Sequence, residues 1–172
     1  MKYFQSAEKN LKHKLSQIIG SPFKSGIKGS TTYFVKEIES HVTVEVPDNS
    51  KAIFERYSKG LLITFFKSNK SSFLAIPFKE ILELRLVKGK ETVQPHFPSP
   101  MWILLRLGLK LDLARYFRLY TSEYRIEETV LLLRTGSIKI IFITNGYTFN
   151  GQSVFFSQLE EIPALQIIET NK

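Results

Sequence analysis

The sequence predicts an α+β protein dominated by antiparallel sheet. Apolar and polar residues alternate with a period of two in many segments between residues 33 and 144, which is typical of half-buried strands. Apolar residues recur every three or four positions only before residue 20 and after residue 151, which predicts a helix near each end. With 172 residues, of which 43% are hydrophobic and 23% charged, the chain can bury a sizeable core.

The first thirty residues predict a basic amphipathic helix and a linker, ahead of a single β-rich domain over residues 31–172. Ser6 can cap the helix, and Gly20 followed by Ser21-Pro22 ends it. The apolar stripe of the helix consists of Ala7, Leu11, Leu15 and Ile18. We expect this stripe to pack on the domain, with a membrane surface or a partner groove as the alternative. The linker lacks the Gly-Lys-Ser/Thr run of a phosphate loop.

Strands follow in succession along the middle of the chain. They are predicted over residues 33–38, 42–46, 61–66, 72–78, 82–87, 130–134 and 138–144. The last two form the clearest hairpin, joined by Thr135-Gly136-Ser137. Pro77 marks an edge or a break, because proline cannot donate to a strand ladder. Residues 51–57 are compatible with either a strand or a helical turn.

The segment 102–114 carries two conflicting signals. Ser99-Pro100 resembles a helix cap followed by proline at the first helical position. However, every odd position from 103 to 113 is apolar, while Arg106 and Lys110 fall on even positions. Those charges would scatter around a helix but share one face of a strand, so we predict a strand. The same alternation predicts a second strand over residues 116–120.

A final helix is expected from Gln152 or Ser153 to Glu161, and Pro163 ends or kinks it. From Leu61 the chain therefore offers seven candidate strands and one C-terminal helix. That order resembles a pleckstrin-homology-like domain, and residues 72–84, Ser-Phe-Leu-Ala-Ile-Pro-Phe-Lys-Glu-Ile-Leu-Glu-Leu, are similar to its bacterial members and to GRAM domains.

The resemblance spans about residues 61–163 and implies a bent antiparallel sheet or barrel capped by the C-terminal helix. Lipid-binding members place a lysine and an Arg-X-Arg around their first loop. Here Lys67 and Lys70 occupy that loop and no Arg-X-Arg follows. The C-terminal helix also lacks the usual tryptophan, since the only one is Trp102. An all-β sandwich or another barrel is the alternative fold.

The charge of the chain is unevenly distributed. The net charge is +8, to which residues 1–29 contribute +5 and residues 61–120 contribute +6. Such asymmetry can steer a protein toward phosphates or anionic lipid, although scattered lysines also serve solubility alone.

The candidate binding site lies on the polar face of the two strands predicted between residues 102 and 120. Arg106 and Lys110 would lie about 13 Å apart on one strand face. Arg118, Tyr116 and Tyr120 would lie beside them, and Lys67 and Lys70 would lie on a nearby loop in a barrel. Cations flanked by aromatic rings suit an anionic head group, a phosphate backbone or an acidic peptide. A solvated sheet face is the alternative interpretation.

Several chemistries have no support in the sequence. The chain has no cysteine, which excludes disulfides, thiolate metal sites and a cysteine nucleophile. His13, His41 and His96 lack metal-ligand spacing, and the adjacent carboxylates Glu127-Glu128 and Glu160-Glu161 point apart. No nucleophile elbow or dinucleotide-binding motif is present. We therefore assign no catalytic, cofactor-binding or metal residues.

The leading hypothesis is a non-catalytic binding module that engages an acidic protein partner or an anionic membrane surface. A nucleic-acid-binding protein and a carrier that holds a small molecule or lipid inside a barrel are the alternatives. Pairing of strand edges into a homo-oligomer is also compatible with the sequence. The N-terminus lacks the apolar stretch of a secretory signal, and no stretch is continuously apolar enough to span a bilayer. A cytoplasmic location, peripheral to the inner face of the membrane, is expected.

Overall fold

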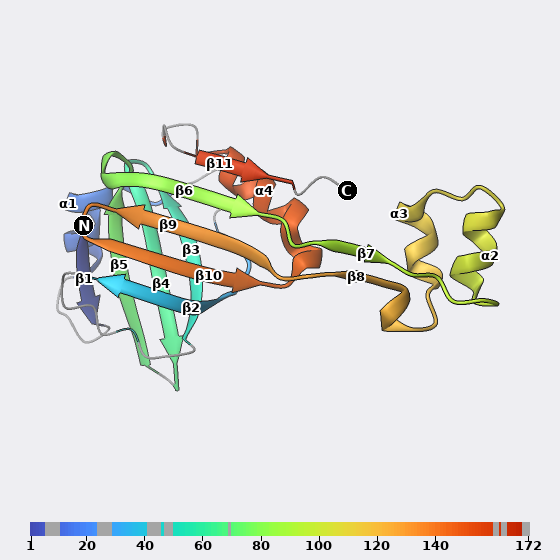
Figure 1. The fold of residues 1–172 in the computed structure, drawn as a ribbon. Helices are drawn as coiled ribbons and strands as arrows, with labels where there is room; N and C mark the ends of the chain where they lie inside the picture. The colour runs from blue at the N-terminus through green and yellow to red at the C-terminus, as the bar shows by residue number, and fades with distance from the viewer. Residues whose placement is uncertain are drawn as a thin grey trace.

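The computed structural model describes residues 1–5, 11–23, 29–40, 46, 50–68, 70–159, 162 and 165–169. Its described part contains one nine-stranded sheet, one two-stranded ribbon and four α-helices (Figure 1). The strands of the large sheet are β1 (Lys2–Gln5), β2 (Tyr33–Ser40), β3 (Lys51–Tyr57), β4 (Gly60–Lys67), β5 (Lys70–Pro77), β6 (Ile81–Val87), β9 (Thr129–Thr135), β10 (Ile138–Thr144) and β11 (Leu165–Ile168). The helices are α1 (Leu11–Ile19), α2 (Pro100–Arg106), α3 (Leu111–Ala114) and α4 (Phe149–Ser157).

The large sheet is open, with the strand order β1-β5-β4-β3-β2-β10-β9-β6-β11. All its neighbours pair antiparallel except β6 and β11, which run parallel. The predicted mainly antiparallel α+β class is confirmed. The closed-barrel alternative is wrong, because β1 and β11 are separate edges of the sheet.

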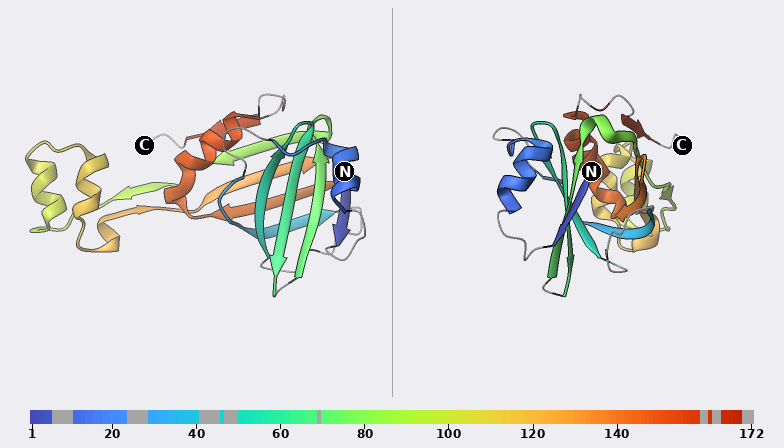
Figure 2. Two further views of the ribbon diagram at one scale, coloured as in Figure 1. Left: turned by 180° about the vertical axis from the view of Figure 1, so that it is seen from behind. Right: turned by 90° about the vertical axis from the view of Figure 1, so that its left-hand side faces the viewer.

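The two halves of the sheet face each other across the core. Phe65 on β4 stacks on Phe142 on β10, with ring centroids 6.4 Å apart. Two strands lie between β4 and β10 in the sheet order, so only a bend in the sheet brings these rings together. Phe54 on β3 meets Phe142 edge to face at 4.9 Å, and Phe156 on α4 approaches Phe54 to 5.7 Å. Packed rings thus fill the interior and α4 covers it (Figures 1 and 2).

A buried polar link fixes α4 to the sheet. The hydroxyl of Tyr33 donates a hydrogen bond to Oε1 of Gln152 at 2.7 Å, and both side chains are buried. Burial raises the pKa of Tyr33, so its hydroxyl keeps its proton. The amide of Gln152 in turn donates to the hydroxyl of Thr31 at 2.6 Å.

Helix α1 packs on the outer side of β4 and β5 rather than standing free. Leu15 and Ile19 are buried in a small cluster that includes Phe4 of β1, Leu62 of β4 and Ala75 of β5. Burial of two large aliphatic side chains contributes roughly 1.5–3 kcal/mol each, which holds the helix on the sheet. The cap predicted at Ser6 and the predicted stripe residue Ala7 lie outside the described residues.

An arm projects from the end of the sheet (Figures 1 and 2). Strand β6 leads into β7 (Glu91–Val93), and β8 (Tyr124–Ile126) leads into β9, so that a two-stranded ribbon continues the β6–β9 pair. Beyond the ribbon lie α2, α3 and the short 3-10 helices η2 (Arg115–Phe117) and η3 (Thr121–Glu123). Met101, Ala114 and Tyr124 form a small separate core there. We call residues 91–126 the arm and residues 97–120, which form its outer part, the tip. The residues outside the arm are called the body.

The strands predicted over residues 102–114 and 116–120 are wrong, because the tip is helical. The hydroxyl of Ser99 accepts the N–H of Trp102 at 3.1 Å, so the cap signal decides the local structure. Helix α2 ends at Arg106 and is followed after one residue by Gly108, whose φ of 85° belongs to the left-handed region that favours glycine. The alternation carries no information here, because a tip with a small core exposes odd-numbered residues such as Leu107 and Leu113.

The remaining strands agree largely with the sequence. The hairpin of β9 and β10 is confirmed, as are the strands at β2, β4, β5 and β6, and residues 51–57 form β3. Within β6, Leu84 and Leu86 are buried, but a bulge after Ile81 leaves Leu82 53% exposed. The predicted C-terminal helix is confirmed, but it begins earlier, at Phe149, and ends earlier, at Ser157 rather than Glu161. The strand predicted over residues 42–46 falls, except for Val46, outside the described part of the chain.

Candidate functional site

The tip exposes an unusual number of large hydrophobic side chains. Fifteen such side chains are exposed in the described part of the chain, and eight of them belong to the tip. These eight are Phe97, Ile103, Leu107, Leu113, Tyr116, Phe117, Leu119 and Tyr120. Soluble surfaces scatter single apolar residues, whereas a concentration of this kind marks an interaction surface.

The same 24 residues carry an excess of positive charge. The tip contains four basic residues, Arg106, Lys110, Arg115 and Arg118, and one acidic residue, Asp112. Its net charge is therefore +3. Among the described residues, no carboxylate lies within 4.0 Å of any of these four cations.

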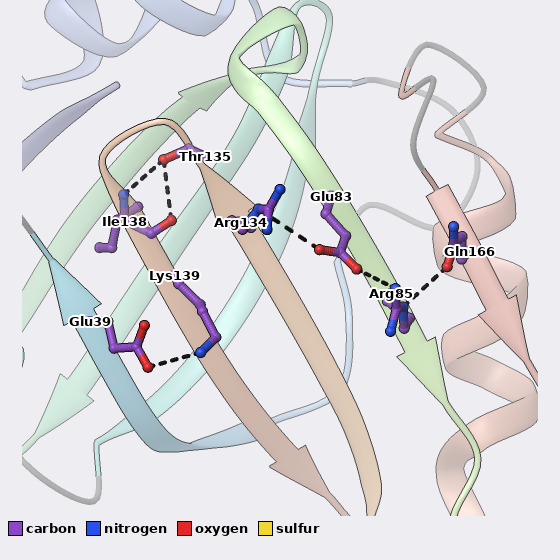
Figure 3. Close-up of polar contacts among 8 residues, drawn as sticks. All are labelled: Glu39, Glu83, Arg85, Arg134, Thr135, Ile138, Lys139 and Gln166. Atoms are coloured by element: carbon purple, nitrogen blue, oxygen red, sulfur yellow. Dashed lines mark hydrogen bonds and ion pairs between the residues drawn. The ribbon is translucent and has the colours of Figure 1, made fainter.

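Several cations of the sheet, by contrast, are paired with carboxylates. Across the sheet, Lys139 pairs with Glu39 at 2.8 Å, and Glu83 binds both Arg85 at 2.6 Å and Arg134 at 3.9 Å (Figure 3). Opposite charges compensate each other in this way at a solvated sheet face, on neighbouring strands for Lys139–Glu39 and Arg134–Glu83 and within β6 for Arg85–Glu83. The four cations of the tip lack this compensation among the described residues.

Aromatic rings accompany the tip cations. The guanidinium of Arg106 lies 5.1 Å from the ring centre of Trp102, and that of Arg115 lies 5.3 Å from Tyr116. Such contacts keep the charge accessible while the ring covers one side of the guanidinium.

A buried carboxylate holds the tip together. Glu123 is fully buried and accepts the backbone N–H groups of Leu119 at 2.7 Å, Tyr120 at 3.0 Å and His96 at 3.2 Å. Burial by itself would raise the pKa of this carboxyl, but the hydrogen bonds from Ser99 and the backbone outweigh it and lower the pKa to about 2. The ionised Glu123 thus ties the loop before α2 to the segment after η2.

A pocket of about 580 Å³ lies where the arm meets the body, and we call it the basal pocket. Arg115 and Arg118 line it from the tip, Lys88 and Glu91 from the start of the ribbon, and Tyr147 from the body. The remaining lining residues are Asp112, Tyr116, Tyr124, Ile126, Gly146, Phe149 and Asn150.

Two tyrosines hold the arginines of the basal pocket. Nη1 of Arg115 donates to the hydroxyl of Tyr124 at 3.0 Å, and Nη1 of Arg118 donates to the hydroxyl of Tyr147 at 3.3 Å. The hydroxyl of Tyr147 also donates to the carbonyl of Tyr124 at 3.0 Å. Burial raises the pKa of Tyr124, although the hydrogen bond from Arg115 acts in the opposite direction.

The structure brings together only part of the predicted site. Arg106, Lys110, Tyr116, Arg118 and Tyr120 all lie in the tip, but on short helices and loops rather than on a sheet face. Lys67 and Lys70 lie opposite each other at the β4–β5 turn, at an end of the body remote from the arm (Figures 1 and 2).

Among the lining residues of the basal pocket, only Tyr116 and Arg118 were predicted from the sequence as site residues. The prediction missed Arg115, Tyr124 and Tyr147, which form hydrogen bonds there. Arg115 falls between the strands predicted over residues 102–114 and 116–120 and was not part of the predicted polar face. Its position three residues before Arg118 is the signal that a helical interpretation would have used, because residues at that spacing lie on one side of a helical turn. No local signal joins Tyr147 to Arg118, which precedes it by 29 residues.

No family model, curated protein or solved structure matches the chain. In the described residues, no group of three or more potential His, Cys, Asp or Glu ligands gathers as a metal site. Within the same residues, no helix is long and apolar enough to cross a membrane.

Proposed function

We propose that the protein is a peripheral membrane-binding module whose tip docks on an anionic bilayer surface. The observation that supports this function is the coincidence, in residues 97–120, of exposed apolar side chains with four cations that lack a carboxylate partner among the described residues. The basic-aromatic binding surface expected from the sequence is retained in this proposal, but it is formed by helical turns.

The physical chemistry of the tip suits a bilayer surface. Apolar side chains gain free energy by leaving water for the boundary between head groups and acyl chains. Trp102 and the exposed tyrosines have rings with a polar end, which favours the depth of the head groups. Each cation near an anionic surface adds about 1 kcal/mol. Arg106 and Lys110 have long stems that let their charges remain in water while their neighbours insert.

The shape of the molecule supports the same function. The arm carries the tip away from the sheet, so the tip can reach a flat surface without interference from the body (Figure 2). We further propose that the body is a pleckstrin-homology-like bent sheet, which the facing halves and the covering helix α4 support. On this proposal the protein binds membrane through its arm rather than through the β4–β5 turn, and it works at the cytoplasmic face.

Sedimentation with vesicles tests the proposal. Neutral vesicles of phosphatidylcholine are compared with vesicles containing 30% phosphatidylglycerol, at low and near-physiological salt. We expect binding to the anionic vesicles that survives physiological salt. Leu107→Gln should weaken this binding about tenfold, because the residue is 77% exposed at the tip. Leu82→Gln, which changes an exposed leucine of the body, should bind like the wild type.

Two results would overturn the membrane proposal. One is the absence of vesicle binding, after which the tip would be tested against an acidic protein partner or a second copy of the chain. The other is equal weakening by Leu107→Gln and Leu82→Gln, which would show that the tip has no special part in the binding.

A further inference from the structure

The basal pocket gathers charged side chains from the tip and from the start of the ribbon. Lys88, Arg115 and Arg118 contribute three positive charges to its lining, and Glu91 and Asp112 contribute two negative charges. The distribution of these charges within the pocket is more informative than their sum.

The negative charge of Glu91 is already compensated. Its Oε2 lies 3.5 Å from Nζ of Lys88. Arg115 and Arg118, by contrast, are held by the neutral tyrosines 124 and 147. No carboxylate of the described chain lies within 4.0 Å of either guanidinium. The side of the pocket at Lys88 and Glu91 is therefore neutral overall, and the tip side carries two guanidinium groups and the carboxylate of Asp112, which lies more than 4.0 Å from both of them.

Two guanidinium groups that are held in place by neutral side chains favour the binding of a planar or tetrahedral oxyanion. Arginine forms two parallel hydrogen bonds with phosphate or carboxylate oxygens, and its charge persists at any physiological pH. The tyrosines leave part of each guanidinium unbonded, because each fork has five N–H donors. A ligand with two negative charges on adjacent oxygens would match the two arginines.

The volume of the pocket argues for a ligand larger than a bare ion. About 580 Å³ falls in the range of small-molecule sites. At its rim the ring of Tyr116 is 74% exposed and can cover the organic part of a ligand. We propose that the basal pocket binds the phosphoryl group of an organic phosphate, with Arg115 and Arg118 as its ligands. The group can come from a soluble phosphate ester or from a phosphomonoester lipid headgroup.

Calorimetric titration of the full chain, without vesicles, tests this site. The probes are glycerol 3-phosphate and dihexanoyl phosphatidic acid below its micelle concentration, with sodium chloride at matched ionic strength as the control. We expect saturable 1:1 binding of at least one phosphate probe and none of chloride. Tighter binding of the short-chain lipid by tenfold or more would identify a lipid headgroup, and equal or weaker binding a soluble ester.

Matched variants assign the binding to the pocket. Arg115→Gln and Arg118→Gln should each lower the affinity at least tenfold, and Arg118→Lys should lower it less because the charge remains. Arg125→Gln is the control, since Arg125 lies on β8 next to Tyr124, is exposed and does not line the pocket. It should bind within twofold of the wild type. Circular dichroism confirms that each variant is folded before it is titrated.

The proposal is overturned by the absence of saturable binding of both phosphate probes, or by an equal loss of affinity in Arg125→Gln. The site does not rest on the membrane proposal, and the two can fail separately. Leu107→Gln should keep its affinity for glycerol 3-phosphate even where it has lost vesicle binding.

Discussion

Arg118 and Tyr147 connect the arm to the body. The guanidinium of Arg118 lies 5.3 Å from the ring centre of Tyr147 and donates to its hydroxyl at 3.3 Å. Tyr147 belongs to η4 (Gly146–Thr148), the 3-10 helix that precedes α4, and its hydroxyl also donates to the carbonyl of Tyr124. One side chain of the body thus contacts the arm at two places, which sets the direction in which the tip points.

We expect Tyr147→Phe to loosen the arm. The variant removes the acceptor for Arg118 and the donor to Tyr124, at a cost of about 1 kcal/mol for each hydrogen bond. Amide exchange in β7 and β8 should accelerate while exchange in β9 and β10 is unchanged. Tyr57→Phe, on β3 of the body, is the control and should leave exchange in the arm as it is. Unchanged exchange in Tyr147→Phe would show that the ribbon alone holds the arm.

The pH dependence of the tip follows from Glu123. Because its pKa falls from 4.5 to about 2 on folding, its contribution to stability is fully present above pH 4.5 and is lost as the pH falls toward 2. Trp102, the only tryptophan, lies in the tip and reports on it by fluorescence. We expect its emission to change between pH 4.5 and 2.

Replacement of the buried carboxylate tests the same contact at neutral pH. Glu123→Gln keeps one acceptor oxygen but loses the charge, so the tip should be loosened at pH 7 and its fluorescence should no longer depend on pH in the acid range. Glu128→Gln, at an exposed position, should titrate like the wild type. A wild-type acid transition that persists in Glu123→Gln would assign the transition to other groups.

Tyr33→Phe should destabilise the body. It leaves Oε1 of the buried Gln152 without its hydrogen bond. The free energy of unfolding, measured by urea denaturation, should fall by about 1–3 kcal/mol. Adding Gln152→Leu to this variant should recover part of the loss, because both partners are then apolar. If the free energy of unfolding of Tyr33→Phe alone lay within about 0.5 kcal/mol of the wild-type value, which is on the order of the measurement error, the buried link would be contradicted.

Gly146→Ala should disturb the joint between arm and body. A Cβ at Gly146 would collide with the backbone carbonyl of Glu127 and would lie 2.7 Å from Cγ2 of Ile126. Overpacking of this kind costs typically about 1–3 kcal/mol, measured by thermal denaturation. At Gly136 an added Cβ meets nothing within 4 Å, so Gly136→Ala is the matched control. Equal stability of the two variants would contradict the close packing at this joint.

The charges of the tip should determine how salt affects vesicle binding. Replacement of both Arg106 and Lys110 by Gln removes about 2 kcal/mol of attraction, which corresponds to roughly 30-fold weaker binding at low salt. The difference should shrink as salt screens the surface potential. The double variant Arg134→Gln and Lys139→Gln removes the same charge from the paired face of the sheet and should have little effect. Equal weakening would indicate a response to net charge alone.

Period-two alternation predicted most of the sheet correctly because each of those strands buries one face. Leu131 and Leu133 on β9 and Ile138, Ile140 and Phe142 on β10 are buried at alternate positions. The strands β1, β7, β8 and β11 were not predicted. Each has three or four residues, which is too short for a periodic pattern to stand out.

The tip shows where prediction from period-two alternation fails. Every odd position from 103 to 113 is apolar, yet none of these side chains is buried, so no buried strand face selects the pattern. The local signals Ser99-Pro100 and Gly108 act through backbone geometry and hydrogen bonds, and they determine the two short helices.

The sequence by itself thus determined the composition of the candidate site: which basic and aromatic residues are available between positions 97 and 120, and that their charge is in excess. Only the tertiary structure decided their arrangement. Lys67 and Lys70 lie far from the tip because the β4–β5 turn and the arm extend from different ends of the sheet. Arg118 meets Tyr147 across 29 residues of sequence, and a contact of that kind depends on how the arm joins the body rather than on any local pattern.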